Sequence, residues 1–155
     1  VHGTGIVATV NIKKNTQIIE YIGEKVTKKE GDKRSSERIK KFLNKKNSGS
    51  VYIFELNKKY DIDGSMLYNK ARYINHSCNP NCEVDIIKNK IWISSIKKIN
   101  KGEELNYDYG YPFNEDDFND HICKCGSDNC VGYIISQDDW VKYKKFIKKI
   151  KKDVK

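Results

Sequence analysis

Three cysteines lie within eight residues near the C-terminal end of the chain, in the segment CKCGSDNC (residues 123–130). Thiolates crowded in this way repel one another unless a cation neutralises them, and zinc takes four ligands in a tetrahedron at about 2.3 Å. Because this segment supplies three ligands, a zinc ion needs a fourth from elsewhere in the chain. The candidates are Cys78, Cys82, His76 and His121. A ligand from the segment NHSCNPNC would fasten residues 123–130 against residues 75–82, which strongly constrains the fold.

The total of five cysteines is odd, which fits poorly with a secreted domain whose cysteines are all paired in disulfides. We therefore expect a reducing compartment and a metal. The rival interpretation, buried cysteines without a metal, is disfavoured because the spacing is too tight for three separate core positions. The 155 residues suffice for one compact domain. No apolar run approaches the roughly 18 residues of a membrane span, so we expect no membrane association.

Short β-branched and aromatic runs, broken by turn residues about every ten positions, predict a β-rich domain with a helix or two. The runs are GIVATVNIKKNTQIIEYIG (5–23, two strands and a turn), VYIFEL (51–56), KKYDIDGS (58–65), EVDIIKNKIWISSI (83–96) and INKGEELNYDYGY (99–111). The fourth run predicts a hairpin with Lys88–Lys90 at its turn. The fifth predicts a turn at Lys101–Gly102 and then a short tyrosine-rich strand.

Residues 27–46 are highly charged and predict a connector that leads into a short surface helix. Ile39, Phe42 and Leu43 have helical spacing within this segment. The residues NSGS (47–50) then end the helix, because small and polar residues in a run favour a loop.

The last twenty residues, 136–155, predict an amphipathic helix. Ser136 followed by Asp139 resembles a helix start, with acidic groups near the positive end. The apolar face is formed by Trp140, Tyr143, Ile147 and Ile150. Eight lysines and three aspartates here contribute +5 to the net charge of +9, which suits a polyanionic partner. We favour the other interpretation, that these lysines form a solvent-exposed face of the helix. Only three of the 30 cationic residues are arginines, so guanidinium groups that could bind phosphate in a bidentate way are scarce.

Four segments resemble, in order and spacing, the SET-domain family of protein-lysine methyltransferases with a cysteine-rich post-SET segment. They are HGTGIVATVNIKKNTQIIEYIGE (2–24), YDIDGSMLYNKARYINHSCNPNC (60–82), INKGEELNYDYGYP (99–112) and CKCGSDNC (123–130). The resemblance implies a β-rich α+β fold of several short sheets with a knot-like threading of the NHSC and GEELNYDYG segments. It divides the chain into a SET domain (1–114), a post-SET zinc segment (115–135) and a basic amphipathic helix (136–155).

The resemblance also implies two cofactors, S-adenosyl-L-methionine and Zn²⁺. The cofactor-binding positions that match the family are His2, Gly3, Thr4, Gly5, Tyr52, Asn75, His76 and Lys124, the last through its backbone. In the family the fourth zinc ligand is the cysteine of NHSC, so the implied metal ligands are Cys78, Cys123, Cys125 and Cys130. Cys82 is then left to core packing. The chain departs from the pattern at two positions: Thr4 stands where some relatives have a basic residue, and Tyr68 replaces the glycine usual before the asparagine.

Methyl transfer from a sulfonium to an amine is an in-line displacement that requires alignment, a neutral amine and a pocket without competing water. Tyrosines suit this chemistry, because their rings wall an aliphatic channel and their hydroxyls orient the amine. By resemblance the catalytic positions are Tyr109, Tyr107 and Tyr21, with Tyr52 also lining the channel. An apolar channel lowers the pKa of the substrate lysine, so no dedicated base is needed. At the position of Tyr107 the family carries either Tyr or Phe. The hydroxyl of a tyrosine there predicts that the substrate lysine receives one or two methyl groups and not three.

The sequence therefore predicts a protein-lysine methyltransferase whose substrate is a lysine-bearing protein or peptide, with histone tails the leading class by analogy. The rivals are a methyltransferase for a non-histone protein and a catalytically idle SET module that binds a partner. Direct binding of nucleic acid, for which the basic C-terminal helix is the candidate, is disfavoured by the scarcity of arginine. A histone substrate implies the nucleus or chromatin. If the substrate is not a histone, we expect the protein to be located in the cytoplasm or to be secreted into a host cell.

Overall fold

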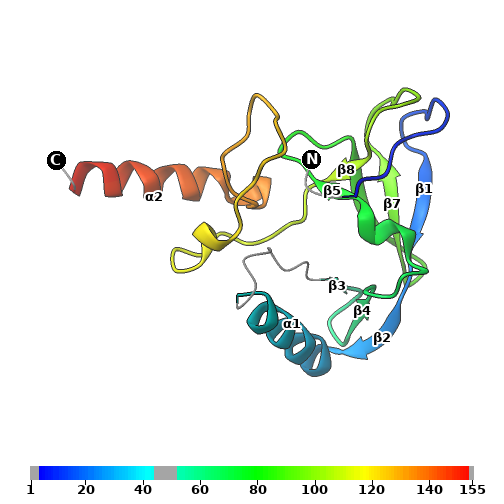
Figure 1. Ribbon diagram of the computed structural model, residues 1–155, viewed down its shortest axis with the longest axis horizontal. Coiled ribbons are helices and arrows are strands. Elements are labelled where there is room, and N and C mark those ends of the chain that lie inside the picture. The colour runs from blue at the N-terminus through cyan, green and yellow to red at the C-terminus, as the bar shows by residue number, and fades with distance from the viewer. Residues whose placement is uncertain (1–3, 44–51, 154–155) are drawn as a thin grey trace.

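The computed structural model describes residues 4–43 and 52–153, and its strands form three small sheets (Figure 1). The first sheet is antiparallel and consists, in spatial order, of β1 (Gln17–Tyr21), β7 (Lys90–Ser95) and β6 (Cys82–Ile87). Strands β6 and β7 form the predicted hairpin. Its turn places Lys88 at φ 49° and Asn89 at φ 63°, the left-handed conformation that a tight two-residue hairpin turn requires. Ile91 and Ile93 alternate into the core from β7 and are almost fully buried.

Only one of the two strands predicted within residues 5–23 is a regular strand, namely β1. The first part of this segment instead makes isolated bridges, Val7 with Glu104 and Ile12 with Ile99. The prediction of a local strand pair was therefore wrong. The apolar residues of the segment pair with a chain segment about ninety positions away, which local patterns do not reveal.

The second sheet carries the first helix. Its strands, in spatial order, are β2 (Glu24–Thr27), β4 (Tyr60–Asp63) and β3 (Ile53–Glu55). Helix α1 (Lys28–Leu43) follows β2 directly, so the predicted charged connector is absent and the helix is longer than expected. The Thr27 hydroxyl accepts a hydrogen bond from the Glu30 N–H at 3.3 Å and thereby caps the first turn. The side chains of residues 41–43 and the predicted stop at 47–50 lie outside the described residues.

The third sheet is a parallel pair of very short strands, β5 (Asn75–His76) and β8 (Asn106–Tyr107), with His76 opposite Tyr107. The short helix η1 (Lys70–Tyr73) leads into β5. Asn81 links the two segments, since its Oδ1 accepts from the Asn106 N–H at 2.9 Å and its Nδ2 donates to the Glu104 carbonyl at 2.8 Å. The pair thus brings together the NHSC and GEELNYDYG segments, which are thirty residues apart in the sequence.

The C-terminal part has its own small core. It contains η2 (Phe118–Asp120), η3 (Gln137–Asp139) and helix α2 (Trp140–Asp153). Buried Phe113, Phe118, Ile135 and Tyr143 pack here with the partly buried Phe146. The prediction that Ile150 belongs to the apolar face was wrong, because its side chain is 41% exposed. Helix α2 projects beyond the body of the molecule there (Figure 1). Phe146 packs in the small core instead.

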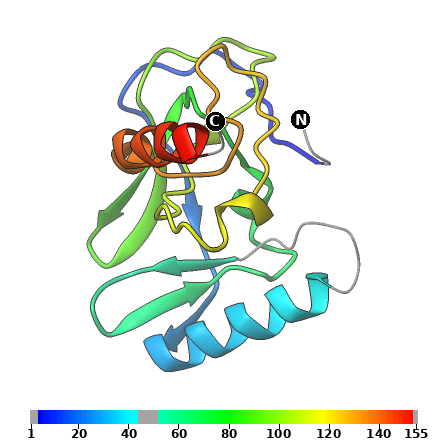
Figure 2. The same cartoon turned by 90° about the vertical axis from the view of Figure 1, so that its left-hand side faces the viewer.

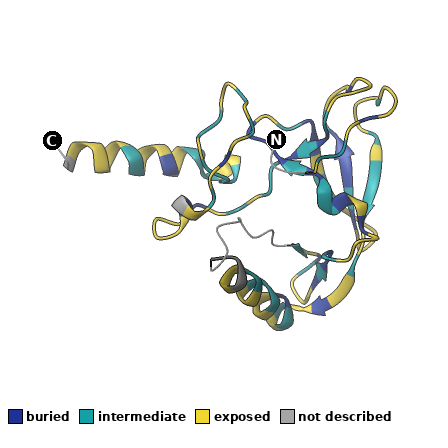
Figure 3. Ribbon diagram, in the orientation of Figure 1, coloured by how far each residue is buried: buried dark blue, intermediate teal, exposed yellow. Residues whose placement is uncertain are grey.

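Figure 2 shows α1 beneath the second sheet, with α2 seen nearly end-on above that sheet. Burial concentrates in the sheets, whereas α2 is mostly exposed and Tyr143 is its buried anchor (Figure 3). Ser136 makes no side-chain capping bond at the start of η3. Within the described ranges, neither helix has the length and apolar character that crossing a membrane demands.

Candidate functional site

Four cysteine sulfurs converge beside the parallel strand pair. The Sγ atoms of Cys78, Cys123, Cys125 and Cys130 all lie within 4.8 Å of one another. Cys78 Sγ is 3.8 Å from both Cys123 Sγ and Cys130 Sγ, which matches the edge of about 3.8 Å that a tetrahedron of sulfurs has around zinc at about 2.3 Å. The donor set is therefore one that fits a structural zinc ion, with Cys78 supplied from the distant segment.

The other three candidates for the fourth ligand have different surroundings. Cys82 is buried in the main core at the start of β6, where burial raises the pKa of its thiol to about 11. The His121 ring stacks on Tyr111 at 5.2 Å between centroids. His76 Nε2 lies 3.7 Å from Cys78 Sγ, but its other ring nitrogen accepts a hydrogen bond from the backbone of Tyr109. Cys78 thus completes the four-sulfur cluster.

Polar groups around the cluster hold the loop of residues 123–130 in place. Asn129 Nδ2 and Gln137 Nε2 each donate to the Cys78 carbonyl at 3.0 Å. Burial disfavours the Cys125 thiolate, but the hydrogen-bond contacts of Cys125 with the Ser127 side chain and the Cys78 N–H outweigh it and lower the pKa of Cys125 to about 6. Burial raises the pKa of Cys78 to about 12. A metal ion would therefore have to displace a proton from Cys78 on binding.

Asn75 and His76 lie directly before this cluster, on β5. Burial lowers the pKa of His76, although the nearby carboxylate of Asp108 opposes the shift, so the ring is neutral at pH 7. Its Nδ1 accepts the Tyr109 N–H at 3.2 Å. Asn75 Nδ2 donates to Glu104 Oε1 at 2.7 Å and approaches the Thr4 carbonyl at 3.5 Å. The N-terminal loop is therefore held against the parallel strand pair.

Gly5 of the predicted cofactor loop packs closely against two side chains. A Cβ atom there would lie 2.3 Å from Glu104 Oε1 and 3.2 Å from Asn75 Nδ2. Thr4 is exposed, as is Lys124 between its two cysteines. His2 and Gly3, the other predicted residues of the loop, lie outside the described residues.

The predicted tyrosines lie along a continuous line of aromatic rings. Ring centroids are 4.4 Å apart for Tyr21 and Phe54, 5.8 Å for Phe54 and Tyr107, and 5.0 Å for Tyr107 and Tyr109. Phe54, from β3, also belongs to this line, although the sequence analysis did not select it. The signal for it was the alternation of residues in VYIFEL, which places Tyr52 and Phe54 on the same face of a strand. Tyr111, also missed, continues the line at 6.4 Å from Tyr109.

The tyrosine hydroxyls of this line stay protonated at neutral pH. Burial raises the pKa of Tyr107, and it does the same for Tyr21 and Tyr109, well above the usual value for tyrosine. Tyr109 donates to the Ile74 carbonyl and Tyr21 to the Tyr52 carbonyl, both at 3.1 Å. A phenol that stays protonated cannot act as a strong base at pH 7. The line therefore provides apolar walls and positioned O–H groups, without a phenolate.

Tyr68, which replaces the usual glycine, lies in an exposed turn and does not need glycine's freedom. The residues other than glycine with positive φ in the described chain are Asn15, Lys88 and Asn89. Tyr68 is 61% exposed and leaves Asn69 free to donate to the Gly64 carbonyl at 2.9 Å. The substitution is thus accommodated without local strain.

Comparison with known proteins identifies the family of this arrangement. The sequence profile described as "SET domain" matches residues 3–110. A histone-lysine N-methyltransferase, H3 lysine-4 specific, of Emericella nidulans is 40% identical over 139 residues, which cover 86% of this chain and 11% of that protein. Histone-lysine N-methyltransferase 2D of Homo sapiens is 39% identical over 134 residues, covering 84% of this chain and 2% of that protein.

A third relative, the histone-lysine N-methyltransferase trr of Drosophila melanogaster, is 40% identical over 134 residues, covering 84% of this chain and 5% of that protein. The chain therefore spans only a small part, between 2% and 11%, of the length of these three relatives. The profile covers well over half of the chain and contains the parallel strand pair and the aromatic line from Tyr21 to Tyr109. The chain belongs to the SET-domain family.

Proposed function

We propose that this chain transfers a methyl group from S-adenosyl-L-methionine to the side-chain amine of a lysine in a protein. One observation carries the proposal: the parallel pair β5–β8 places neutral His76 and Tyr109 in direct hydrogen-bond contact, at the end of a buried aromatic line, in a chain of this family. The alternative of a catalytically idle binding module has no comparable support, because Asn75, His76 and Tyr109 are all present at the positions that match the family.

The residues proposed to hold the cofactor come from the N-terminal loop, from β5, from the residue before β3 and from the cysteine-rich loop. They are His2, Gly3, Thr4, Gly5, Tyr52, Asn75, His76 and Lys124. When bound, S-adenosyl-L-methionine supplies a methyl group on a positively charged sulfur. Thr4 and Asn75 are already linked through the Thr4 carbonyl, so the loop and the strand are held in fixed positions before a ligand binds beside them.

The chain's own residues would perform the remaining tasks. The rings of Tyr21, Tyr107 and Tyr109 exclude water from an aliphatic lysine stem, and a poorly hydrated site favours the neutral amine. The hydroxyls orient that amine for in-line displacement. Because the pKa values of these tyrosines are raised, the proton of the substrate ammonium has to leave to solvent before the reaction.

The hydroxyl of Tyr107 supports a preference for mono- or dimethylation. The side chain is almost fully buried and lies 5.0 Å from the ring of Tyr109. A hydroxyl in this position occupies space and holds the amine or a water molecule by a hydrogen bond. An amine that already carries methyl groups then fits less well.

The four cysteines are proposed to bind zinc, which would supply a structural clamp between the C-terminal segment and the NHSC segment. Histone H3 is the leading substrate, because relatives are named histone H3 lysine-4 specific methyltransferases. That substrate implies the nucleus or chromatin. A non-histone protein remains the alternative, and the lysine-rich α2 is expected to be a solvated face and not a nucleic-acid site.

Incubation with radiolabelled S-adenosyl-L-methionine, a panel of purified histones and a cell extract tests the proposal. We expect label on a histone with the wild-type chain and loss of that label with Tyr109→Phe, which removes one hydroxyl and keeps the ring. Label on another protein only would favour the non-histone alternative. Absence of tyrosine-dependent label on every protein would favour the idle module.

A further inference from the structure

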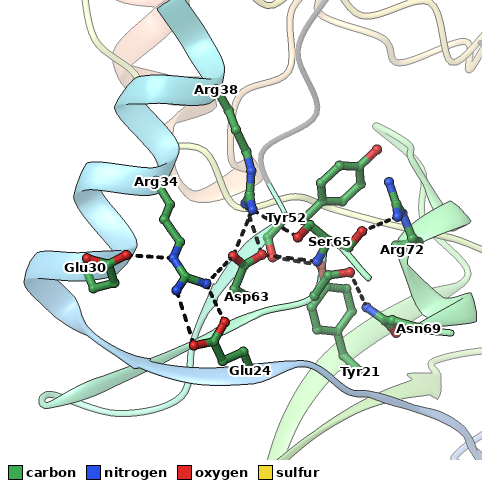
Figure 4. A network of polar contacts seen from close by, with 11 residues as sticks. Tyr21, Glu24, Glu30, Arg34, Arg38, Tyr52, Asp63, Ser65, Asn69 and Arg72 are labelled. Carbon is green, nitrogen blue, oxygen red and sulfur yellow. Dashed lines mark hydrogen bonds and ion pairs between the residues drawn. The ribbon is translucent and has the colours of Figure 1, made fainter. Parts of the chain in front are cut away.

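All three arginines of this lysine-rich chain lie around one short turn, residues 63–65, at the end of β4 (Figure 4). Arg34 and Arg38 reach it from α1, and Arg72 reaches it from η1. The other 27 cationic side chains are lysines. A chain that uses lysine almost everywhere else therefore uses guanidinium groups at this turn, where their geometry is needed.

Asp63 is the centre of the arrangement and is 1% exposed. Arg38 grips both of its carboxylate oxygens, at 3.0 and 2.8 Å, and Arg34 Nη1 donates to Oδ2 at 2.9 Å. Arg38 also donates to the Ser65 hydroxyl at 3.0 Å. One guanidinium thus binds three acceptors in fixed directions. A lysine ammonium, which is a point charge on a flexible stem, does not reproduce this fork.

The turn touches two of the tyrosines assigned to the channel. The Gly64 N–H donates to the Tyr52 carbonyl at 2.8 Å, and the Tyr21 hydroxyl donates to the same carbonyl at 3.1 Å. There is no room for a side chain at Gly64, because a Cβ atom would lie 2.2 Å from the Tyr21 ring. A displacement of the turn would therefore shift Tyr21 and Tyr52 with it.

Arg72 fixes the same turn from the other side. It donates to the Ser65 carbonyl, and its guanidinium lies 4.2 Å above the Tyr52 ring. Arginine stacks on aromatic faces in this way, and the contact holds the ring as well as the backbone. The turn and the Tyr52 ring are thus held together from α1 and from η1.

We propose that Arg34, Arg38 and Arg72 are positioning residues that set the distance between Tyr21 and Tyr52, and thereby the width of the lysine channel. The proposal rests on the proposed methyl transfer. Channel width decides how many methyl groups the amine can carry and how well it is aligned. The arginines would thus determine the product and the rate of the chemical step without touching the substrate.

The competing explanation is that the arginines only fasten α1 to the sheet. The chain provides a matched control for it, because Lys28 makes the same kind of link. Its Nζ lies 2.6 Å from Asp61 and 2.8 Å from Glu55, so it joins α1 to strands β4 and β3. Neither of these two ion pairs involves residues 63–65. Lys28→Gln removes a link between the same elements and leaves the turn untouched.

The test compares three variants: the double variant Arg34→Lys with Arg38→Lys, the single variant Arg72→Lys, and Lys28→Gln. The lysine replacements keep the charges near Asp63 and remove the forks. We expect kcat to fall by about tenfold to a hundredfold in the arginine variants, with KM for the protein substrate changed less, and the ratio of mono- to dimethylated product to shift. Lys28→Gln should change neither kcat nor the product ratio.

A second measurement does not depend on activity. In protein with ¹³C-labelled tyrosine rings, the resonances of Tyr21 and Tyr52 should shift or broaden in the arginine variants. Those of Tyr143, in the second core, should remain unchanged, and Lys28→Gln should alter none of the three. Unperturbed Tyr21 and Tyr52 resonances, or equal effects in Lys28→Gln, would overturn the proposal. If the wild-type chain transfers no methyl group, the proposed function fails, and the resonances alone still decide whether the arginines position the tyrosines.

Discussion

The backbone N–H of Tyr109 donates to Nδ1 of His76 over 3.2 Å, so the residue assigned to catalysis and a residue assigned to the cofactor share one hydrogen bond across two chain segments. His76 is buried and neutral, and its Nε2 lies 3.7 Å from the sulfur of Cys78. One imidazole thus adjoins both the aromatic line and the four-cysteine cluster. The proposed reaction site and the proposed metal site are therefore coupled through a single side chain.

Replacing His76 by Ala should leave the Tyr109 N–H without an acceptor in the interior. An unsatisfied buried donor costs about 1–3 kcal/mol, so we expect the free energy of unfolding to fall by that amount. Urea unfolding of the zinc-loaded protein measures it. His76→Gln, whose amide oxygen can accept the bond, should recover part of the loss. An Ala variant as stable as the wild type would contradict the assigned role of this bond.

The metal content should depend on Cys78 and not on Cys82, although both are buried cysteines of the same segment. We expect about one zinc ion per wild-type chain and a large loss of zinc in Cys78→Ser, because a tetrahedral site requires four thiolates. Cys82→Ser should retain the metal. Elemental analysis after gel filtration measures both variants.

Removing zinc with a chelator should also expose residues 123–130 to protease before the rest of the chain, since the cluster fastens this loop to Cys78. Limited proteolysis followed by mass spectrometry reveals the order of cleavage. Equal protection of the loop with and without chelator would show that the clamp is not made by a metal.

Tyr107→Phe should increase the number of methyl groups on the product. The change removes a buried hydroxyl and keeps the ring contacts with Phe54 and Tyr109, so the fold should be retained. Mass spectra of the methylated substrate at completion measure the distribution. An unchanged distribution, with activity preserved, would show that the Tyr107 hydroxyl does not limit the product.

The ion pairs of Asp63 should make stability depend on pH in the acid range. Burial works against the charged carboxylate, but hydrogen bonds from Arg38 and Arg34 outweigh it and hold the pKa of Asp63 well below its usual value. A carboxyl whose pKa is lower in the folded state stabilises fully above its unfolded pKa, about 3.9, and loses that stabilisation as the pH falls.

We therefore expect the wild type to be more stable than Arg38→Gln by about 2 kcal/mol near neutral pH, with a difference that holds down to about pH 5 and shrinks as the pH falls from about 5 to about 2. Urea unfolding of both proteins across this range measures it, and loss of zinc at low pH affects both alike. A difference that stays constant on acidification would mean that the contribution of Arg38 is not ionic.

Features that depend on local sequence were predictable. The β6–β7 hairpin followed from two alternating runs around Lys88 and Asn89, which accept a left-handed turn. The three clustered cysteines implied a fourth ligand, and the resemblance selected Cys78. Both inferences rest on chemistry that neighbouring residues carry with them.

Features that depend on distant contacts were not predictable. Helix α1 has few apolar residues and weak periodicity, and its position owes much to the ion pairs of Arg34 and Arg38 with Asp63, about 25 to 29 residues away. Phe54 entered the aromatic line because β3 pairs with β4 beside Tyr21. Ile150 continued a valid helical pattern, but the body of the protein ends before it.

Methyl transfer to a defined lysine is the central claim, and mass spectrometry of histone H3 incubated with S-adenosyl-L-methionine tests it most directly. Tyr143→Phe is the matched control for Tyr109→Phe, because it also removes a hydroxyl that donates to a carbonyl, in the second core. We predict one or two methyl groups on a lysine with the wild type and with Tyr143→Phe, and none with Tyr109→Phe. Unmodified histone in all three reactions, or equal methylation with Tyr109→Phe, would contradict the claim.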